Sequence, residues 1–80
     1  MKAIIHSMPD CIACDQVKNS LKHLGIDIAI TDLEEVVKTD KLVKKQLEDQ
    51  GGAAPVVEMV EPGNSTRRMV EPRKIIIGLI

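Results

Sequence analysis

Apolar and polar residues follow two different periods along this chain, and the periods separate strands from helices. A short β-branched run at residues 2–7, bounded by Pro9, predicts a first strand. In residues 11–24 the apolar positions recur at steps of three and four, which is the spacing of one helix face. They are Cys14, Val17, Leu21 and Leu24. Gly25 follows where a helix end favours a left-handed residue, so we expect a strand and then a helix.

A second unit of the same kind comes next. Residues 26–33 alternate, with isoleucine at every second position and polar residues between them, which predicts a half-buried strand. Its apolar face contains Ile26, Ile28 and Ile30, opposite Asp27 and Thr31. Residues 39–50 then predict a helix with Thr39 or Asp40 as its N-cap. Its apolar face contains Leu42, Val43 and Leu47, its lysines alternate with acids as on a solvated face, and Gly51 and Gly52 end it.

The last third of the chain predicts a hairpin and a short terminal element. Pro55 stands where a strand tolerates proline, immediately before an apolar strand at residues 56–61. Pro62-Gly63-Asn64 is a turn sequence, after which residues 66–70 can return as the partner strand. Pro72 suits the first position of a helix, whereas Ile75-Ile76-Ile77 favours a strand. For residues 72–80 we predict a short helix.

The predicted order is therefore β-α-β-α-β-β with a final helix, in one domain spanning residues 1–80. Strands that alternate with helices imply a parallel pair joined by a right-handed crossover. The hairpin adds antiparallel strands. We expect an α/β fold with a four-stranded mixed sheet and helices on both of its faces.

Composition excludes several classes of protein. The 80 residues include 11 basic and 12 acidic side chains and no aromatic ones. Without a basic excess or an aromatic ring to stack on bases, nucleic-acid binding is not expected. The chain has neither a membrane-length apolar run nor the pattern of a secretory signal at its start. Its two cysteines are too close together to crosslink distant loops, so we expect a protein of the reducing cytoplasm. We also expect a monomer.

The two cysteines form the motif Cys11-Ile12-Ala13-Cys14, at the predicted junction of the first strand and first helix. At a helix N-terminus, unpaired backbone N–H groups and the helix dipole favour a thiolate, which is the nucleophilic form of cysteine. Cys14 begins the apolar face and should be more buried. The asymmetry suits a two-step exchange in which Cys11 attacks a disulfide and Cys14 then releases the mixed disulfide.

Acidic neighbours moderate this activation. Asp10 and Asp15 flank the motif, and nearby negative charge opposes thiolate formation. We expect the pKa of Cys11 to be lowered moderately, into the upper part of the range of about 3.5–7.5 found at such sites. A less stabilised thiolate corresponds to a reducing rather than a strongly oxidising redox couple.

Two other interpretations of the cysteines stay open at this point. A zinc site would have to recruit His6 and His23, but Cys14 and His23 lie about 900° of helical rotation apart and so on opposite sides of the helix. Alternatively, both cysteines could fill the core as small apolar residues. That alternative explains neither their spacing nor their position at the start of a helix.

The arrangement resembles a known family. A first strand, the Cys-x-x-Cys helix, a second βα unit and the segment Ala54-Pro55-Val56-Val57 are similar to the thioredoxin fold, and specifically to a glutaredoxin. The resemblance covers nearly the whole chain and is closest to the NrdH-redoxins. Further matches are Gly25-Ile26-Asp27 and the segment Glu71-Pro72-Arg73-Lys74-Ile75.

The resemblance implies specific roles. Cys11 is the nucleophile, Cys14 is the resolving thiol, and Pro55 matches a proline preceded by a cis peptide bond beside the reactive sulfurs. Ala54 would offer its backbone to an extended substrate segment. The residues expected to contact the substrate are Ile12, Ala13, Ala54, Pro55 and Val56. No bound metal or cofactor is implied; the redox group is the Cys11–Cys14 disulfide itself.

Departures from the family affect the source of electrons. Ile12 and Ala13 stand where glutaredoxins carry an aromatic residue, and Met69-Val70 replace the paired glycines that let the backbone approach glutathione. The resemblance therefore implies electrons from NADPH through a separate thioredoxin reductase-like protein rather than from glutathione. It also implies a protein disulfide as substrate, with ribonucleotide reductase as the candidate. The alternatives are a glutathione-dependent glutaredoxin, an iron–sulfur carrier and a zinc-binding interaction module.

Overall fold

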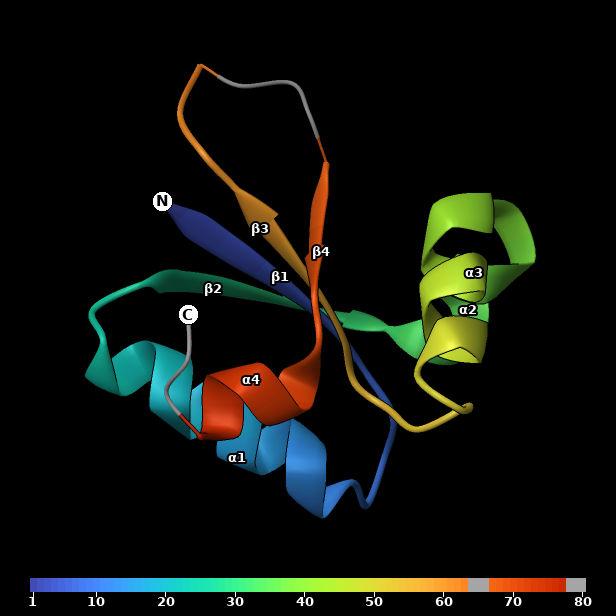
Figure 1. Cartoon of the computed structure of the whole chain (residues 1–80), viewed down its shortest axis with the longest axis horizontal. Helices are drawn as coiled ribbons and strands as arrows, with labels where there is room; N and C mark the ends of the chain where they lie inside the picture. The colour runs from blue at the N-terminus through green and yellow to red at the C-terminus, as the bar shows by residue number, and fades with distance from the viewer. Residues whose placement is uncertain (64–66, 78–80) are drawn as a thin grey trace.

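A computed structural model describes residues 1–63 and 67–77 of the chain. Its strands and helices, in chain order, are β1 (Lys2–Ser7), α1 (Ile12–His23), β2 (Asp27–Asp32), α2 (Leu33–Thr39), α3 (Lys41–Asp49), β3 (Val56–Val60), β4 (Arg68–Val70) and α4 (Pro72–Ile76). Figure 1 shows the strands crossing the centre of the molecule, with α1 and α4 on one side and α2 and α3 on the other.

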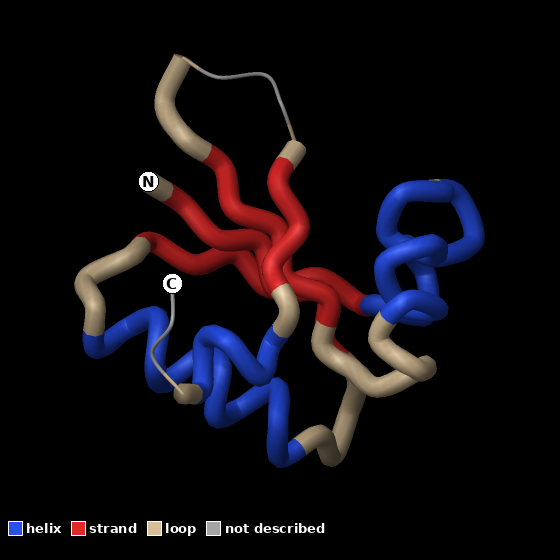
Figure 2. The backbone as a smooth tube through the Cα atoms, viewed as in Figure 1, coloured by secondary structure: helices blue, strands red, loops and turns tan. Residues whose placement is uncertain are grey.

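The four strands form one mixed sheet in the order β2-β1-β3-β4. β1 runs parallel to β2 and antiparallel to β3, and β3 and β4 are antiparallel. Figure 2 shows how the sheet twists between the two groups of helices. The α/β class, the mixed four-stranded sheet and the helices on both faces confirm the predicted fold class, and the arrangement is compatible with a thioredoxin-like fold.

One face of the sheet packs against α1 and α4. The buried side chains of this face are all apolar and form one cluster, contributed by the sheet and by both helices. It contains Ala3, Ile5, Val17, Leu21, Val57, Met59, Val70 and Ile75. Because these side chains alternate along β1 and β3, the opposite face receives the residues between them. This cluster fixes α1, and with it the cysteine motif at the start of α1.

The opposite face packs against α2 and α3 around a smaller cluster. Leu33, Val43 and Val56 form its buried centre, and Val36, Val37, Leu47 and other partly buried apolar residues surround it. The remaining buried positions of this face, His6 and Glu58, are polar. The two faces therefore differ in chemistry as well as in size.

The helix α2 is the main element that the sequence pattern missed. Residues 26–33 were predicted as one strand, but β2 ends at Asp32 and Leu33 begins α2. The Asp32 carboxylate accepts a hydrogen bond from the Glu34 N–H at 3.0 Å, which is an N-cap. Asp40 caps α3 in the same way, which confirms one of the two predicted N-caps. Thr39, the other, is the last residue of α2.

Three apolar residues that were predicted to face the core are exposed. Leu24, at 57% exposure, is the C-cap of α1, where the chain turns away into Gly25. Ile30 lies on the edge strand β2, which has β1 as its single neighbour in the sheet. Leu42 is exposed because α3 contacts the second cluster through Val43 and Leu47.

The C-terminal elements largely follow the prediction. The return strand is β4, shorter than the predicted 66–70, and residue 66 lies outside the described residues, as does Asn64 of the predicted turn. Pro72 is the first residue of α4, which confirms a helix there; residues 78–80 lie outside the described part. Among the described helices, none has the length and apolar character needed to cross a membrane.

Candidate active site

The two cysteines form a disulfide at the N-terminus of α1. Cys11 is the N-cap, with an extended backbone (φ −103°, ψ 107°), and Cys14 lies in the first turn. The backbone N–H of Cys14 donates a hydrogen bond to the Cys11 Sγ at 3.1 Å. A sulfur at this position accepts from a free helix N–H and lies at the positive end of the dipole. Both interactions favour a negative charge on Cys11 once the disulfide is reduced.

The two sulfurs differ in access to solvent. Cys14 is 5% exposed and faces the sheet, whereas Cys11 is half-buried at the surface. This confirms the expected asymmetry between an outer and an inner cysteine. An attacking thiolate has to reach another molecule, and a resolving thiol needs to reach only its neighbour. The geometry suits Cys11 for the first task and Cys14 for the second.

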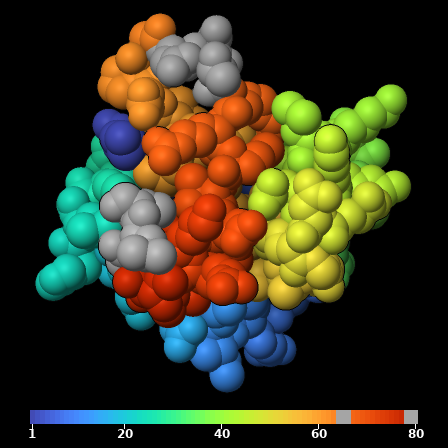
Figure 3. All heavy atoms as spheres, viewed as in Figure 1, coloured from blue at the N-terminus to red at the C-terminus, as the bar shows by residue number. Residues whose placement is uncertain are grey.

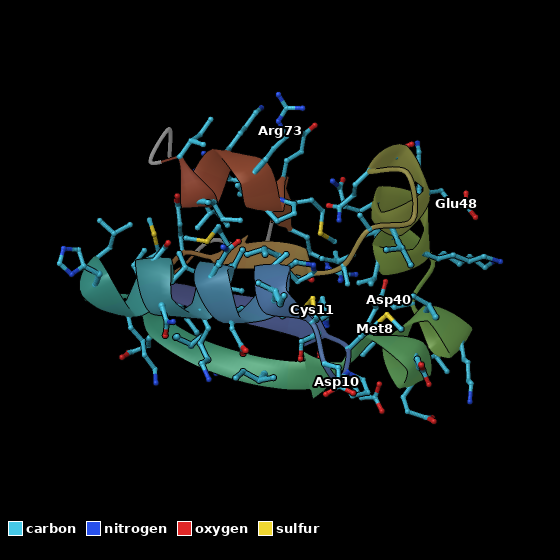
Figure 4. The ribbon with its side chains drawn as sticks, turned by 90° about the horizontal axis from the view of Figure 1, so that it is seen from below. Met8, Asp10, Cys11, Asp40, Glu48 and Arg73 are labelled. Atoms are coloured by element: carbon cyan, nitrogen blue, oxygen red, sulfur yellow. A yellow bond between two sulfur atoms is a disulfide. The ribbon has the colours of Figure 1, made fainter. Side chains whose placement is uncertain are left out.

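The loop between β1 and α1 presents Cys11 at the molecular surface. Asp10 adopts a left-handed conformation (φ 56°), which aspartate tolerates better than most residues, and it turns the chain into the helix. The apolar side chains of Met8 and Ile12 are exposed beside the disulfide, and Ile12 reaches 77% exposure. Figure 4 shows Cys11 at the start of α1 with Asp10 close by, while Arg73 of α4 and Glu48 of α3 lie further away on two other sides.

A second segment approaches the motif from the loop before β3. The Ala54–Pro55 peptide bond is cis, as the resemblance to glutaredoxins implies. Among the described residues, the backbone of Ala54 has no hydrogen-bond partner. Gln50, the residue after α3, holds this loop: its amide Nε2 donates to the carbonyl oxygens of Ala53 at 2.7 Å and Pro55 at 2.8 Å. The side-chain oxygen of Gln50 in turn accepts from the amide of Gln46 at 3.1 Å.

A groove of about 390 Å³ connects these segments. Ala13, between the cysteines, lies on one wall, and Ala53 and Ala54 lie on another. The end of α3 and the start of α4 complete it, and in Figure 3 the yellow residues around the end of α3 lie beside the red α4. The groove is within the size range of small-ligand and peptide pockets, about 300–1,000 Å³.

The sequence-predicted contact residues are only partly brought together. Ala13 and Ala54 line the groove, as the resemblance implies for substrate contacts. Ile12 points to solvent next to the groove rather than into it. Pro55 and Val56 are fully buried, and Val56 belongs to the second core cluster. Their side chains are therefore committed to the core, and the parts of this loop that line the groove are Ala53 and Ala54.

Sequence reasoning did not find Gln50 or the charged residues of the groove, Asp49, Glu71 and Arg73. All four lie at or next to the end of a helix, and in the sequence each is typical of an ordinary solvated position. The one local feature beside Gln50 is the Gly51-Gly52 pair, which marks the end of the helix but not a contact of the Gln50 side chain.

Sequence reasoning also missed a chain of polar residues on the face of the sheet that carries α2 and α3. His6 lies between Thr31, which its Nδ1 contacts, and Glu58, whose carboxylate is 3.5 Å from Nε2. A neutral imidazole can satisfy both partners, accepting from the Thr31 hydroxyl and donating to Glu58. Arg67 closes the chain with two hydrogen bonds to Glu58, at 2.6 and 2.8 Å, and two to Asp40, at 2.8 and 3.1 Å.

This polar chain perturbs its own members. Hydrogen bonds from Arg67 lower the pKa of Glu58 and outweigh its partial burial, which acts in the opposite direction. The same guanidinium lowers the pKa of Asp40, with smaller contributions from the N–H groups of Val43 and Leu42. The pKa of Arg67 is raised in return. Because Asp40 caps α3, the chain ties that helix to β3 and to Arg67, the residue before β4.

The structure also bears on the zinc interpretation. His6 is occupied by Thr31 and Glu58, and His23 is exposed at the far end of α1. Within residues 1–63 and 67–77, no three His, Cys, Asp or Glu side chains form a group that could hold a metal ion.

No protein-family model matches the chain, and no curated protein matches it significantly. The resemblance to glutaredoxins therefore stays a prediction from the residues, now accompanied by a compatible fold and by a disulfide at the predicted place.

Proposed function

We propose that this protein is a thiol–disulfide oxidoreductase that reduces disulfides of other proteins through Cys11 and Cys14. The observation that carries the proposal is the position of the disulfide: its outer sulfur is the N-cap of a helix and accepts an N–H from the first turn, and its inner sulfur is buried. A core-filling role would not need one of the two cysteines to lie half-buried at the surface.

The reaction has two exchange steps that start from the reduced form. The Cys11 thiolate attacks one sulfur of a target disulfide. The target S–S bond breaks, a mixed disulfide forms, and the second target sulfur leaves as a thiolate that takes a proton from water. Cys14 then attacks the Cys11 sulfur, and the mixed disulfide breaks. The proton of Cys14 passes, directly or through water, to the departing target sulfur, so the target leaves as a dithiol with two more electrons and the Cys11–Cys14 disulfide forms.

The surroundings of the disulfide support a protein as substrate. The backbone of Ala54 lies at the groove and has no hydrogen-bond partner within residues 1–63 and 67–77, so an extended segment carrying the target cysteine could hydrogen-bond to it as an added strand. Gln50 holds both neighbouring carbonyls and keeps this edge in place. Exposed Met8 and Ile12 supply apolar contact area beside the sulfur.

The finer parts of the proposal rest on the resemblance. We infer that a separate NADPH-dependent reductase returns the disulfide to the dithiol, and that the protein acts in the cytoplasm, where a thiol pair can be kept reduced. Ribonucleotide reductase is the candidate substrate. Met69 and Val70 stand where the resemblance places the paired glycines of glutaredoxins, and this departure favours a protein reductase over glutathione as the electron source.

The test is reduction of insulin disulfides with two electron sources. The full chain should turn over with NADPH and a thioredoxin reductase, and much more slowly with glutathione, glutathione reductase and NADPH. Cys11→Ser should abolish turnover, because no nucleophile remains. Cys14→Ser should accumulate a mixed disulfide that mass spectrometry detects, because the resolving thiol is absent.

The alternatives give different results in the same preparation. Turnover with glutathione alone, or a coloured dimer after iron–sulfur reconstitution, would indicate a glutathione-dependent protein. Stoichiometric zinc, with loss of the fold on chelation, would indicate an interaction module. If neither electron source supports reduction and both cysteines react equally slowly with an alkylating agent, the proposal is wrong.

A further inference from the structure

The groove beside the disulfide has charged residues on its rim and an apolar floor. Its apolar lining includes Ala13, Ala54, Pro72 and Ile76. Its charged lining consists of Asp49 at the end of α3 and of Glu71 and Arg73 at the start of α4. Two carboxylates and one guanidinium leave the rim with an excess of one negative charge.

Neither carboxylate has an evident role in stabilising the fold. Asp49 is the last residue of α3, where the helix dipole disfavours a negative charge, and the last turn of that helix has no basic residue. Glu71 is the N-cap of α4, but its side chain makes no capping hydrogen bond. Within the described residues, neither carboxylate takes part in an ion pair. Both are therefore free to interact with a molecule in the groove.

The wider surroundings of the disulfide have the same sign. Asp10 and Asp15 flank the cysteine motif, and Glu48 lies next to Asp49 on α3. Figure 4 shows Asp10 and Glu48 on different sides of Cys11. Arg73 is the positive side chain on the groove itself. A cysteine-bearing segment that enters this groove therefore meets two carboxylates and one guanidinium, and the other basic side chains of α1 and α4 nearest to it in the sequence are Lys18 and Lys74.

We propose that the groove binds the disulfide-bearing segment of a partner protein through Lys or Arg side chains next to its cysteine, and that it disfavours acidic disulfides. This inference rests on the proposed function and specifies its substrate. Asp49 and Glu71 attract the flanking basic side chains, while the backbone of Ala54 pairs with the segment. The positive charge of Arg73 repels the same basic side chains, so it weakens the preference of the groove for them. Glutathione disulfide, whose carboxylates outnumber its ammonium groups, is disfavoured by the same charges.

The experiment uses three fluorogenic peptide disulfides of equal length whose residues next to the reacting cysteine are Lys, Ser or Glu. The pre-reduced full chain is mixed with each peptide, and the second-order rate constant is measured in a single turnover, so that no reductase takes part. At low salt, we expect the Lys peptide to react about three- to tenfold faster than the Glu peptide, because exposed charge pairs are individually weak. The ratio should fall as salt rises.

Variants assign the preference to the groove. Asp49→Asn with Glu71→Gln should bring the Lys-to-Glu ratio close to one, whereas Arg73→Gln should raise it. The matched control is Asp27→Asn with Glu61→Gln, which makes the same change in net charge at the opposite end of the sheet, beside Lys2 and Val60 rather than the cysteine motif. The control should keep the wild-type ratio. Far-ultraviolet circular dichroism confirms that each variant is folded.

The results separate the two proposals. Equal rates for the three peptides would overturn the charge preference and leave the oxidoreductase proposal in place. A preference that survives Asp49→Asn with Glu71→Gln would overturn its assignment to the groove. Failure of the reduced protein to reduce any of the peptides would overturn the proposed function, and the charge preference with it.

Discussion

The sheet face that carries α1 and α4 is filled with apolar side chains, whereas the face that carries α2 and α3 combines a small apolar cluster with a chain of charged and polar ones. The first face holds the helix that begins at the disulfide. The second holds α3, which ends at the groove, through Arg67 and Asp40. The position of the cysteines therefore depends on apolar burial, which does not change with pH. The position of α3, whose end lines the groove, depends on ion pairs, which do change with pH.

The largest expected effect is the loss of a large side chain from the apolar face. Leu21→Ala removes a fully buried side chain on α1, and we expect the free energy of unfolding to fall by about 2–5 kcal/mol. Urea unfolding followed by circular dichroism measures it, since the chain has no aromatic fluorophore. The control is Leu24→Ala on the same apolar period, which is exposed and should cost less than about 0.5 kcal/mol. Equal losses would contradict the packing described for α1.

The second effect probes the ionic face. Glu58→Gln keeps the shape of a buried side chain but removes the charge that Arg67 contacts twice, and we expect a loss of about 1–3 kcal/mol. Glu61→Gln, at an exposed pair with Arg68, is the matched control and should change the stability little.

The same variant has a pH signature. The pKa values of Glu58 and Asp40 are lower in the folded state than their ordinary values of 4.5 and 3.8, so the folded state binds fewer protons than the unfolded one. Their contribution to stability is present above the ordinary pKa values and is lost as the pH falls through the lower folded values. The urea midpoint should therefore drop between neutral pH and acid, and Glu58→Gln should make the drop shallower. An unchanged slope would show that these ion pairs do not set the pH dependence.

The smallest expected effect lies where the two faces meet, at the groove. Gln50→Ala removes two hydrogen bonds to the loop that contains Ala54, and we expect a loss of stability of about 1 kcal/mol. The KM for a protein disulfide should rise severalfold, while the rate at which Cys11 reacts with a small alkylating agent stays the same. The control is Gln46→Ala, which removes the hydrogen bond from Gln46 to Gln50 but leaves both hydrogen bonds from Gln50 to the loop. An equal slowing of alkylation would mean that Gln50 acts on the helix rather than on the loop.

Local patterns predicted those parts of the molecule whose causes are local. The β-branched run gave β1 its observed bounds, the step of three and four placed Cys14, Val17 and Leu21 in the core, and Pro72 marked the start of α4. The exposed position of Cys11 relative to Cys14 followed from where the helix begins. The helix α2 was missed because Asp32 is both the last residue of β2 and the N-cap of α2. A hydropathy pattern cannot show both roles at one residue.

Contacts between distant residues could not be predicted in this way. Arg67 meets Glu58 and Asp40 at separations of 9 and 27 positions, and His6 meets Glu58 at 52. Each of these residues is typical of a solvated surface when it is considered alone, and burial becomes favourable only when all of them are assembled. The groove is similar, because Ala13, Gln50 and Glu71 come from three separate elements.

The disulfide closes a very small ring, because Ile12 and Ala13 are the residues between its two ends. A crosslink stabilises a protein mainly by restricting the unfolded chain, and the effect grows with the length of the loop that it closes. Opening this small ring should therefore lower the thermal melting temperature less than opening a long loop would, and it should move little of the backbone. If the pair cycles between disulfide and dithiol as proposed, repeated cycling would then require no refolding of the domain.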